Sequence, residues 1–446
     1  MFSKVLIANR GEIALRIART CRELGIRTVA VYAESDAGRI GEYADEAICI
    51  GPAAARQSYL HAAAVTEAAL LTGADAIHPG YGFLSEDPDF AEICRENGLV
   101  FIGPPADVLR RLGDKSTARE AAAGAGLPVL PGSDTVPNLR AAARVAEDIG
   151  FPLIVKAVAG GGGRGMTVVR DRSALRDAYV ATRTTALALF GDGRVYLERF
   201  LDGARHVEAQ ILADAYGNVV HLGLRDCSVQ RRHQKLLEET PAPVLAAGLT
   251  DRIADGAANA ARTAGYTGAG TYEFLIDAHG HHYFMEVNCR LQVEHPVTEM
   301  ATGIDLVREQ LLIAGGEKLA IPQPGIAPRG AAIECRVNAE DPKRDFAPAP
   351  GTIDEFEIPH GHFTRVDTHL RPGMTVTADY DPLLAKVVVW APERGQAIAR
   401  MDLALSEFRV SGPGMATTID FLREVLGSQR FRTGSHTTGL VSEMAP

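Results

Sequence analysis

The first hundred residues alternate short apolar runs with stretches of helical periodicity. Strands are predicted at 4–8, 28–32, 47–50, 76–78 and 99–102. After the first strand, residues 12–24 place Ile13, Ile17 and Cys21 on one stripe of a predicted helix, and Gly25 follows where the helix should end. Short strands that alternate with helices favour a parallel sheet with helices on both faces. We therefore predict an α/β domain over residues 1–113.

Charged residues lie on the opposite face of this predicted helix, at Arg16, Arg19 and Glu23. Such charges usually form a solvated face, and a subunit contact is the alternative. The pattern alone favours the solvated face.

The fourth predicted strand is followed by a loop with the sequence HPGYGFLSED. Asp87 is expected to cap the next helix and Pro88 to open it. Ligands of open α/β sheets bind beyond the carboxyl ends of the strands. The loop is therefore either part of a binding site or plain turn chemistry.

A glycine-rich stretch, KAVAGGGGRGM, separates two short apolar runs at 151–155 and 166–169. We predict that the glycines join two strands of a small lid, within a segment of linker and lid over residues 114–203. Without Cβ atoms, consecutive backbone N–H groups can surround an anion. The spacing does not fit a GxxxxGK[ST] loop, but Lys156 and Arg164 can both pair with phosphate. A cover over nucleotide phosphates is favoured, and a flexible linker is the alternative.

From residue 204 to residue 446 the pattern changes. The alternating runs HVEAQILAD and NVVHLGLRD meet at residues 215–218, as expected for neighbouring antiparallel strands. Downstream lies DCSVQRRHQK, which is either a solvated charge run or part of an anion site. For its His233, and for the earlier His206, the residues alone favour a structural role over a role as ligand or base.

A second hairpin is predicted in GTYEFLIDAHGHHYFMEVNCR. If His279 and Gly280 form a two-residue turn, Glu273 stands directly opposite Glu286. Like charges facing each other require something positive between them. Asn288 and Arg290 project from the same face as Glu286. The carboxylate and amide oxygens on this face are ligands that suit Mg²⁺ or Mn²⁺ together with substrate phosphates. The alternative is a pair of exposed glutamates.

Composition narrows the class of protein. With 446 residues, of which 46% are hydrophobic, the chain is long enough for two or three domains. No apolar run approaches a membrane helix, and the run at 5–8 is broken by Asn9 and Arg10, so we expect a cytoplasmic protein without a secretory signal. A net charge of −10 argues against nucleic-acid binding. Six scattered cysteines suggest neither zinc nor disulfides.

Seven motifs together resemble the biotin carboxylase component of biotin-dependent carboxylases, an ATP-grasp enzyme: IANRGEIA, HPGYGFLSE, GDKSTAR, GGGGRGM, RDCSVQRRHQK, EVNCRLQVEHPVTEM and ECRVNAEDP. The resemblance covers nearly the whole chain and is most specific through Glu340. It departs at Cys289, where the family often has a small or hydroxyl residue, and at Arg199, where lysine is frequent. It implies an ATP-grasp fold with an N-terminal Rossmann-like domain, a lid and a C-terminal domain of mixed and antiparallel sheet.

The resemblance also implies residue roles. ATP would be bound by Lys115, Lys156, Gly161, Gly162, Gly163, Arg164, Gly165, Met166, Glu198, Leu201, His206, Gln230, His233, Glu273 and Glu286. Two Mg²⁺ or Mn²⁺ ions would lie at Glu273, Glu286 and Asn288. Bicarbonate would be held by Lys235, Arg290, Gln292, Val293 and Glu294. Glu294 would act as the base, Lys235 and Arg290 would assist, and Arg336 would stabilise the biotin enolate beside Tyr81. Arg16, Arg19 and Glu23 match a homodimer contact.

The implied activity is ATP- and bicarbonate-dependent carboxylation of biotin through carboxyphosphate, as the first half-reaction of an acetyl- or propionyl-CoA carboxylase. Biotin is expected on a separate carrier protein, with a separate carboxyltransferase subunit. No lysine here has Ala-Met-Lys-Met neighbours, and the chain stops at Pro446 without a further β-rich domain. The alternatives are a pyruvate or other biotin-dependent carboxylase, another ATP-grasp ligase, and an inactive structural subunit.

Overall fold

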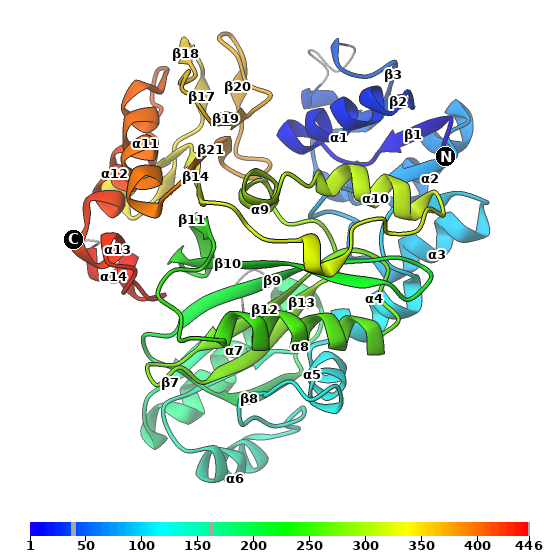
Figure 1. Cartoon of the computed structure of the whole chain (residues 1–446). Helices are drawn as coiled ribbons and strands as arrows, with labels where there is room; N and C mark the ends of the chain where they lie inside the picture. The colour runs from blue at the N-terminus through cyan, green and yellow to red at the C-terminus, as the bar shows by residue number, and fades with distance from the viewer. Residues whose placement is uncertain (37–41, 160–164, 445–446) are drawn as a thin grey trace.

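The computed structural model describes residues 1–36, 42–159 and 165–444. Its N-terminal part is a five-stranded parallel sheet in the order β3-β2-β1-β4-β5, drawn in blue at the upper right of Figure 1. The elements are β1 (Lys4–Ile7), α1 (Gly11–Glu23), β2 (Arg27–Ala33), β3 (Glu46–Gly51), α2 (Ala62–Thr72), β4 (Ala76–His78), α3 (Pro88–Glu96) and β5 (Val100–Phe101). The predicted parallel sheet is confirmed, with boundaries within one or two residues.

Helices cover both faces of this sheet, as predicted. Val5 and Ile7 pack with Ile17 of α1, whereas Leu6 packs on the other side with Val65 of α2. Because side chains of a strand alternate in direction, these neighbours reach opposite faces. The α1 face is completed by α10 (Leu306–Ala314), which begins about two hundred residues after the end of β5. The predicted cap is also present, since Asp87 accepts hydrogen bonds from the backbone N–H groups that follow it.

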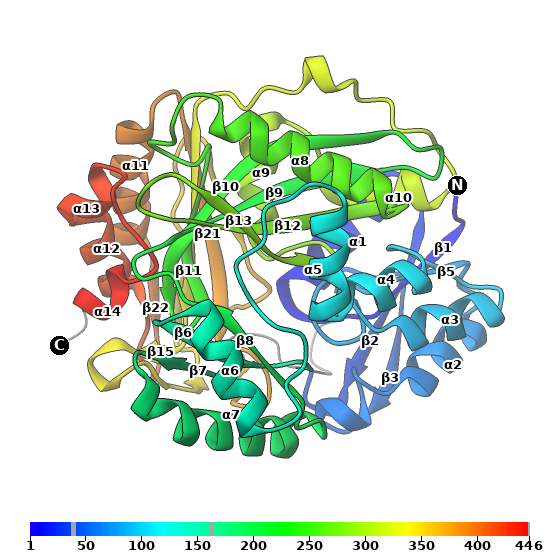
Figure 2. The same ribbon diagram turned by 90° about the horizontal axis from the view of Figure 1, so that it is seen from below.

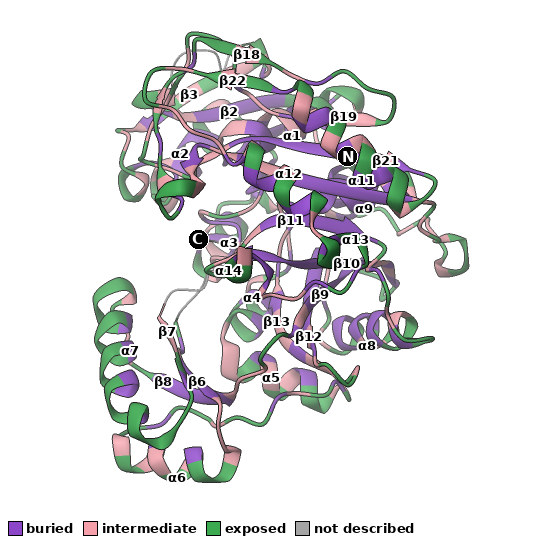
Figure 3. Cartoon of the chain, turned by 90° about the vertical axis from the view of Figure 1, so that its left-hand side faces the viewer, coloured by how far each residue is buried: buried purple, intermediate pink, exposed green. Residues whose placement is uncertain are grey.

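A small body of three antiparallel strands, β7-β6-β8, carries two helices on its outer side. It stands apart at the lower left of Figure 3, and its helices expose their outer faces. Its elements are α6 (Leu139–Ile149), β6 (Leu153–Ala157), β7 (Met166–Val169), α7 (Leu175–Phe190) and β8 (Val195–Arg199). Strands β6 and β7 pair on either side of the glycine stretch, as predicted. Gly161, Gly162, Gly163 and Arg164 lie outside the described residues.

Two helices, α4 (Ala106–Gly113) and α5 (Lys115–Gly124), connect the first sheet with the small three-stranded body, which is the predicted lid.

The largest sheet has eight strands in the order β13-β12-β9-β10-β11-β14-β21-β19, all paired antiparallel. They are β9 (Arg205–Ala213), β10 (Val219–Arg231), β11 (Gln234–Thr240), β12 (Gly268–Ile276), β13 (His282–Asn288), β14 (Ala331–Asn338), β19 (Thr364–Asp367) and β21 (Leu383–Ala391). The predicted antiparallel arrangement is confirmed.

Helix α8 (Leu249–Thr263) lies along strands β9, β10 and β12, as Figure 2 shows. Ile253 and Ala257 of this helix pack against Val207 and Ala209 of β9. The even-numbered residues of β9 therefore project from the other face. That face is the one that carries the candidate site.

The remaining elements complete the C-terminal part. They are α9 (His295–Thr302), β15 (Glu340–Asp341), β16 (Ala347–Pro348), β17 (Gly351–Thr352), β18 (Glu355–Glu357), β20 (Thr375–Val376), α11 (Arg394–Glu407), β22 (Arg409–Ser411), α12 (Ile419–Gly427), α13 (Gln429–Arg432) and α14 (Leu440–Met444). Helices α11 and α12 share a core with the inner residues of β14 and β21. None of the described helices is long and apolar enough to span a membrane. Cysteines 21, 94, 227, 289 and 335 are free and buried, and Cys49 is free and exposed.

The hairpin of β12 and β13 places Glu273 directly opposite Glu286, as predicted, but by a different route. The turn is one residue longer than expected, because Phe274 pairs with Phe284 and Asp277 N–H bonds to the His281 carbonyl. A register shift between Glu273 and Phe274 compensates for this longer turn. The two deviations cancel, so the two carboxylates still share one face.

Candidate active site

One face of the eight-stranded sheet carries a row of charged side chains. Glu273 pairs in register with Glu208, and Glu238 pairs with Glu334. Further along, Arg336 pairs with Lys386. The alternate residues of the same strands, such as those at 237, 335 and 337, lie in the hydrophobic core on the other side. The row is buried, and its charges must therefore compensate one another.

Lys235, at the start of β11, is the centre of this row. Its Nζ lies 2.6 Å from Glu208 Oε2, 2.9 Å from Glu273 Oε1 and 2.5 Å from Glu294 Oε1. It also donates to the side-chain oxygen of Gln292 at 3.2 Å. Burial disfavours the charged ammonium, but the three carboxylates outweigh burial and raise the pKa of Lys235 well above its ordinary value. Lys235 is therefore a fixed cation.

Glu294, fully buried just before α9, lies between two cations. Its Oε1 faces Lys235, and its Oε2 accepts a hydrogen bond of 2.8 Å from Arg336 Nη2. Burial favours the neutral acid, but the charges of Lys235 and Arg336 prevail and lower the pKa of Glu294. The side chain is thus an ionised carboxylate that could accept a proton.

The two predicted metal ligands meet two lysines. Glu273 touches Lys235, and Glu286 Oε2 lies 3.3 Å from Lys115 Nζ. The positive charge predicted between the two carboxylates is therefore supplied by side chains. Asn288 donates to Glu273 Oε1 at 2.7 Å, and its oxygen accepts from Arg290 at 3.0 Å. Glu273 is almost fully buried, so the alternative of two exposed glutamates does not hold.

These residues fit a hard divalent cation, because the carboxylate side chains of Glu273 and Glu286 share one face of the hairpin and only one of them is deeply buried. The donor atoms of His206, Glu208 and Glu273 also lie within 4.8 Å of one another. Lys235 already contacts both of those carboxylates. The group of His206, Glu208 and Glu273 is therefore less accessible to a metal ion.

Cationic groups converge beside the two carboxylates. His206 Nε2 lies 2.8 Å from Glu273 Oε2, and Gln230 contacts the other ring nitrogen. Burial opposes the charge of His206, but Glu273 outweighs burial and raises its pKa. His233 has its pKa lowered by burial and then by the charges of Lys156, His206 and Lys115. Groups that repel one another in this way form a site for an anion such as phosphate.

The predicted ATP-binding residue Glu198 lies in β8 and forms ion pairs with Lys156 and with Arg119. Leu201 follows this strand and is partly exposed. The neighbouring Arg199 donates to the Ile149 carbonyl at 3.1 Å, inside the lid. Gly165 and Met166 belong to the hairpin of β6 and β7, where the Gly165 carbonyl accepts a hydrogen bond from the Ala157 N–H.

Four of the five predicted bicarbonate residues lie in the segment that joins β13 to α9, and the fifth, Lys235, lies at the start of β11. Arg290 Nε donates to Glu86 Oε2 at 2.8 Å, and Glu86 also accepts from the backbone N–H of Cys289. Gln292 donates to Glu273, while the Val293 carbonyl accepts from Lys386 at 3.0 Å. Because Glu86 ends the HPGYGFLSE loop, that loop supports the site rather than serving only as a turn.

Tyr81, predicted to lie beside biotin, is in the same loop. Its hydroxyl donates to Glu12 of α1, and Lys386 Nζ lies 3.0 Å from the same carboxylate. Lys386 is the cross-strand partner of Arg336. Tyr81 and Arg336 are therefore linked through one buried lysine.

The charge run DCSVQRRHQK covers the end of β10 and the start of β11, and its charged residues fall into two groups. Arg231 and Arg232 pair with Asp345 at the surface, whereas His233 and Lys235 belong to the site. The surface pairs of Arg231 and Arg232 fit the solvated charge run, and the anion site stays a prediction for His233 and Lys235.

The charged face of α1 also differs from a simple solvated face. Arg19 and Glu23 are exposed, but Arg16 is held within the chain by Glu299 at 2.8 Å and Asp305 at 2.7 Å. The predicted homodimer contact stays a prediction.

The sequence analysis missed several charged residues on the buried face of the eight-stranded sheet: Glu208, Arg225, Glu238, Glu334 and Lys386. Arg225 is fully buried against Glu208 at 2.5 Å. Their signal is charge that alternates with apolar residues along a strand, which usually indicates a solvated face. A pairing of these strands would have been needed to see that the face is buried.

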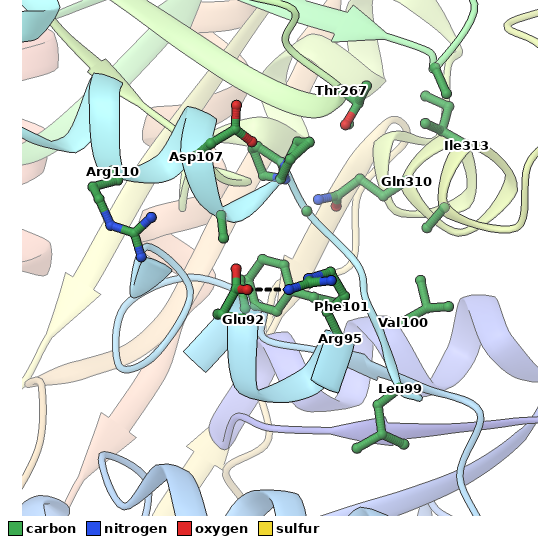
Figure 4. A pocket seen from close by; sticks show the side chains of 18 residues that line it. Glu92, Arg95, Leu99, Val100, Phe101, Asp107, Arg110, Thr267, Gln310 and Ile313 are labelled. Carbon is green, nitrogen blue, oxygen red and sulfur yellow. Dashed lines mark hydrogen bonds and ion pairs between the residues drawn. The ribbon is translucent and has the colours of Figure 1, made fainter. Parts of the chain in front are cut away.

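A separate pocket of about 520 Å³ lies between α3, α4 and α10 (Figure 4). Phe101 and Gln310 are among its lining residues. None of the predicted site residues lines it, so it is a different place from the charged row.

Comparison with known protein families matches three consecutive parts of the chain. Residues 1–109 match "Biotin carboxylase, N-terminal domain", residues 114–321 match "Carbamoyl-phosphate synthase L chain, ATP binding domain", and residues 334–443 match "Biotin carboxylase C-terminal domain". Together these matches cover most of the sequence.

Among curated proteins, a biotin carboxylase from Nostoc sp. is 50% identical over 445 residues, with 99% of each chain covered. The crystal structure of the biotin carboxylase–βγ-ATP complex from Campylobacter jejuni has a TM-score of 0.96 at 44% identity and 99% coverage of both chains.

The biotin carboxylase domain dimer of 2-oxoglutarate carboxylase from Hydrogenobacter thermophilus, in complex with MgADP, ADP and bicarbonate, has a TM-score of 0.96. It is 46% identical, with 99% of this chain and 98% of that chain covered. The predicted ATP-grasp fold is thereby confirmed.

Proposed function

The chain belongs to the biotin carboxylase family and is an ATP-grasp ligase, and we propose that it carboxylates the biotin of a separate carrier protein with ATP and bicarbonate. One observation carries the proposal most directly. Glu294 is a buried, ionised carboxylate fixed between Lys235 and Arg336. Glu294, the proposed base, therefore lies between Lys235 on the metal side and Arg336 on the proposed biotin side.

The phosphates of ATP would lie among Lys115, Lys156, His206 and His233. Transfer of a phosphoryl group requires cations on its oxygens more than covalent help. Glu273 and Glu286 would hold Mg²⁺ or Mn²⁺, which when bound offsets phosphate charge. Two related structures, one in complex with βγ-ATP and one with MgADP and bicarbonate, support these ligand classes.

Bicarbonate would lie against Lys235, Arg290, Gln292 and the backbone of Val293. Glu294 would remove the proton of bicarbonate, so that a bicarbonate oxygen can attack the terminal phosphorus of ATP; the bond to the β-phosphate breaks, ADP leaves and carboxyphosphate forms. Lys235 offsets the charge that accumulates in this step, because it already touches Glu294 and Glu273. Arg290 is held in place by Glu86.

Carboxyphosphate would release CO₂, and the phosphate left behind would remove the proton of the biotin ureido nitrogen. Arg336 would then stabilise the enolate-like ring that attacks CO₂. Tyr81 would lie beside the same ring. The hydrogen bond between Arg336 and Glu294 supports this proposal, in which the two steps take place next to each other.

The final acceptor is proposed to be an acyl-CoA, with pyruvate or another 2-oxo acid as the alternative, since one related structure belongs to a 2-oxoglutarate carboxylase. A carboxyltransferase subunit would use the carboxylated carrier. The subunits that copurify with this chain identify the acceptor. We also propose a homodimer, with Arg16, Arg19 and Glu23 near the contact.

Bicarbonate dependence separates this proposal from the rival functions. Hydrolysis of ATP that requires bicarbonate favours a biotin carboxylase, whereas a ligase for another carboxylic acid needs that acid instead. Nucleotide binding without turnover in the presence of bicarbonate and biotin would favour a structural subunit.

Loss of one carboxylate should weaken metal binding. We expect Glu286→Gln to lower the affinity for Mn²⁺ in the presence of ADP by at least about tenfold, because it removes one charged oxygen ligand. Electron paramagnetic resonance measures free Mn²⁺ independently of turnover. The exposed Glu317→Gln serves as the control, and an unchanged affinity in Glu286→Gln would contradict this assignment.

The source of biotin gives a second test. We expect no covalent biotin on this chain by mass spectrometry. We also expect kcat/KM for a biotinylated carrier domain to be at least about tenfold higher than for free biotin, because tethering raises the effective concentration. A biotinylated lysine, or equal efficiency with both substrates, would overturn the proposal of a separate carrier.

A further inference from the structure

Two buried glutamates meet beside Arg336 without a role in the chemistry above. Glu238 of β11 and Glu334 of β14 are directly opposite each other in the sheet register. Arg336 follows Glu334 by two positions and therefore projects from the same face. Both glutamates are fully buried. Two carboxyl groups thus lie at one cross-strand position next to the proposed biotin-binding arginine.

The contacts of this pair are incomplete for two carboxylates. Arg336 Nη2 lies 2.5 Å from Glu238 Oε1 and 2.8 Å from Glu294 Oε2. Within the described part of the chain, no group donates a hydrogen bond to either oxygen of Glu334 or to Oε2 of Glu238. A buried carboxylate without donors is costly. A proton on one of the two carboxyls would supply the missing donor.

The surrounding charges decide which carboxyl holds that proton. The groups that face the pair are Lys235 of β11, Glu294 before α9, Arg336 of β14 and Lys386 of β21. Burial raises the pKa of Glu334 well above its ordinary range, and the nearby Glu238 raises it further. Burial also raises the pKa of Glu238, to about 7, against the effect of Arg336. Glu334 is therefore the acid, and Glu238 ionises near neutrality.

Resting on the proposed function, we propose that Glu238 and Glu334 are positioning residues that share one proton, and that this pair holds Arg336 toward the ring oxygen of biotin. The Glu334 hydroxyl donates to Glu238, so the carboxylate acquires its missing donor. When Glu294 accepts the proton of bicarbonate, it loses its negative charge. Glu238 then remains as the anion that keeps the guanidinium in place.

The number of carboxybiotin molecules formed per ATP hydrolysed measures this positioning. We expect Glu238→Gln to lower this ratio at least fivefold at pH 8 and to raise KM for biotin. Glu334→Leu should lower it similarly, because leucine cannot donate. Glu334→Gln should retain at least half of the wild-type ratio, since its amide N–H can replace the hydroxyl. The matched control is Glu239→Gln, a buried neighbour on the other face that pairs with Arg394. This control should keep the wild-type ratio.

The pH profile provides a second measurement. Below about pH 7 the wild-type Glu238 is protonated, so the ratio should fall as the pH decreases through that value. In Glu238→Gln the ratio should stay low and show no step there. Effects of pH on bicarbonate and on ATP hydrolysis affect both the numerator and the denominator, so the ratio isolates the biotin step.

Infrared spectroscopy tests the shared proton without turnover, so it applies even where a Glu238 variant does not fold. At pH 8 the wild type should show the carbonyl stretch of a protonated carboxyl that disappears in Glu334→Gln. Absence of that band, or an unchanged ratio in Glu238→Gln, would overturn the proposal. If the wild type forms no carboxybiotin, the proposed function fails, and the band alone then decides whether the two glutamates share a proton.

Discussion

We expect Glu294→Gln to lower bicarbonate-dependent ATP hydrolysis by at least about 100-fold, the lower end of what a general base contributes. Glutamine keeps the size of the side chain but cannot accept the proton of bicarbonate. Lys235 retains Glu208 and Glu273 as partners, so the site keeps its fold. ATP affinity should change no more than a few fold, because the carboxylate acts on bicarbonate rather than on the nucleotide.

Steady-state ATP hydrolysis with and without bicarbonate measures this loss, and equilibrium nucleotide binding measures the affinity. The matched control is Glu299→Gln on the following helix, a buried glutamate that pairs with Arg16 and Arg365 away from the site. Full turnover by Glu294→Gln would show that another group is the base.

The second large effect is expected from Lys235→Met. This change removes the cation that touches Glu208, Glu273 and Glu294 together, and each of these buried carboxylates then keeps only its second partner, Arg225, His206 or Arg336. Removing one partner of a buried ion pair destabilises a protein by about 3–5 kcal/mol. We therefore expect the free energy of unfolding to decrease by about that amount. Turnover should also fall by at least about 100-fold.

Urea denaturation gives the free energy of unfolding, and turnover is measured below the onset of unfolding. Lys343→Met, on the exposed surface, is the control for the loss of one lysine. A stable variant that is inactive would mean that the carboxylates rearrange without Lys235. A stable and active variant would contradict the central position given to this residue.

The local pattern of the sequence was sufficient for the first sheet and for the lid hairpin, because strand and helix periods are local properties. The position of α10 on the first sheet was not predictable, since it depends on a contact with α1, whose residues lie nearly three hundred positions earlier in the chain. The facing of Glu273 and Glu286 was right although the turn was wrong. A longer turn and a bulge compensate each other, and neither has a clear signal in the residues themselves.

The motifs identified residues that lie together in the structure, such as Lys235, Arg290 and Glu294. They did not reveal Glu208, Glu238 and Glu334, which alternate with apolar residues along their strands. Such alternation normally indicates a face exposed to water. Here that face is buried, so the charges compensate one another instead of being solvated. Only the register of several strands makes that burial visible.

The position of α10 on the N-terminal sheet has a consequence for synthesis of the chain. When β5 has left the ribosome, the sheet strands are complete but the face beside α1 still lacks its second helix. About two hundred more residues must follow, which takes roughly 10–40 s at about 5–20 residues per second. During that interval the apolar surface formed by residues such as Val5 and Ile7 is only partly covered. The nascent chain therefore has a window in which chaperones that bind apolar surface compete with its own later helix.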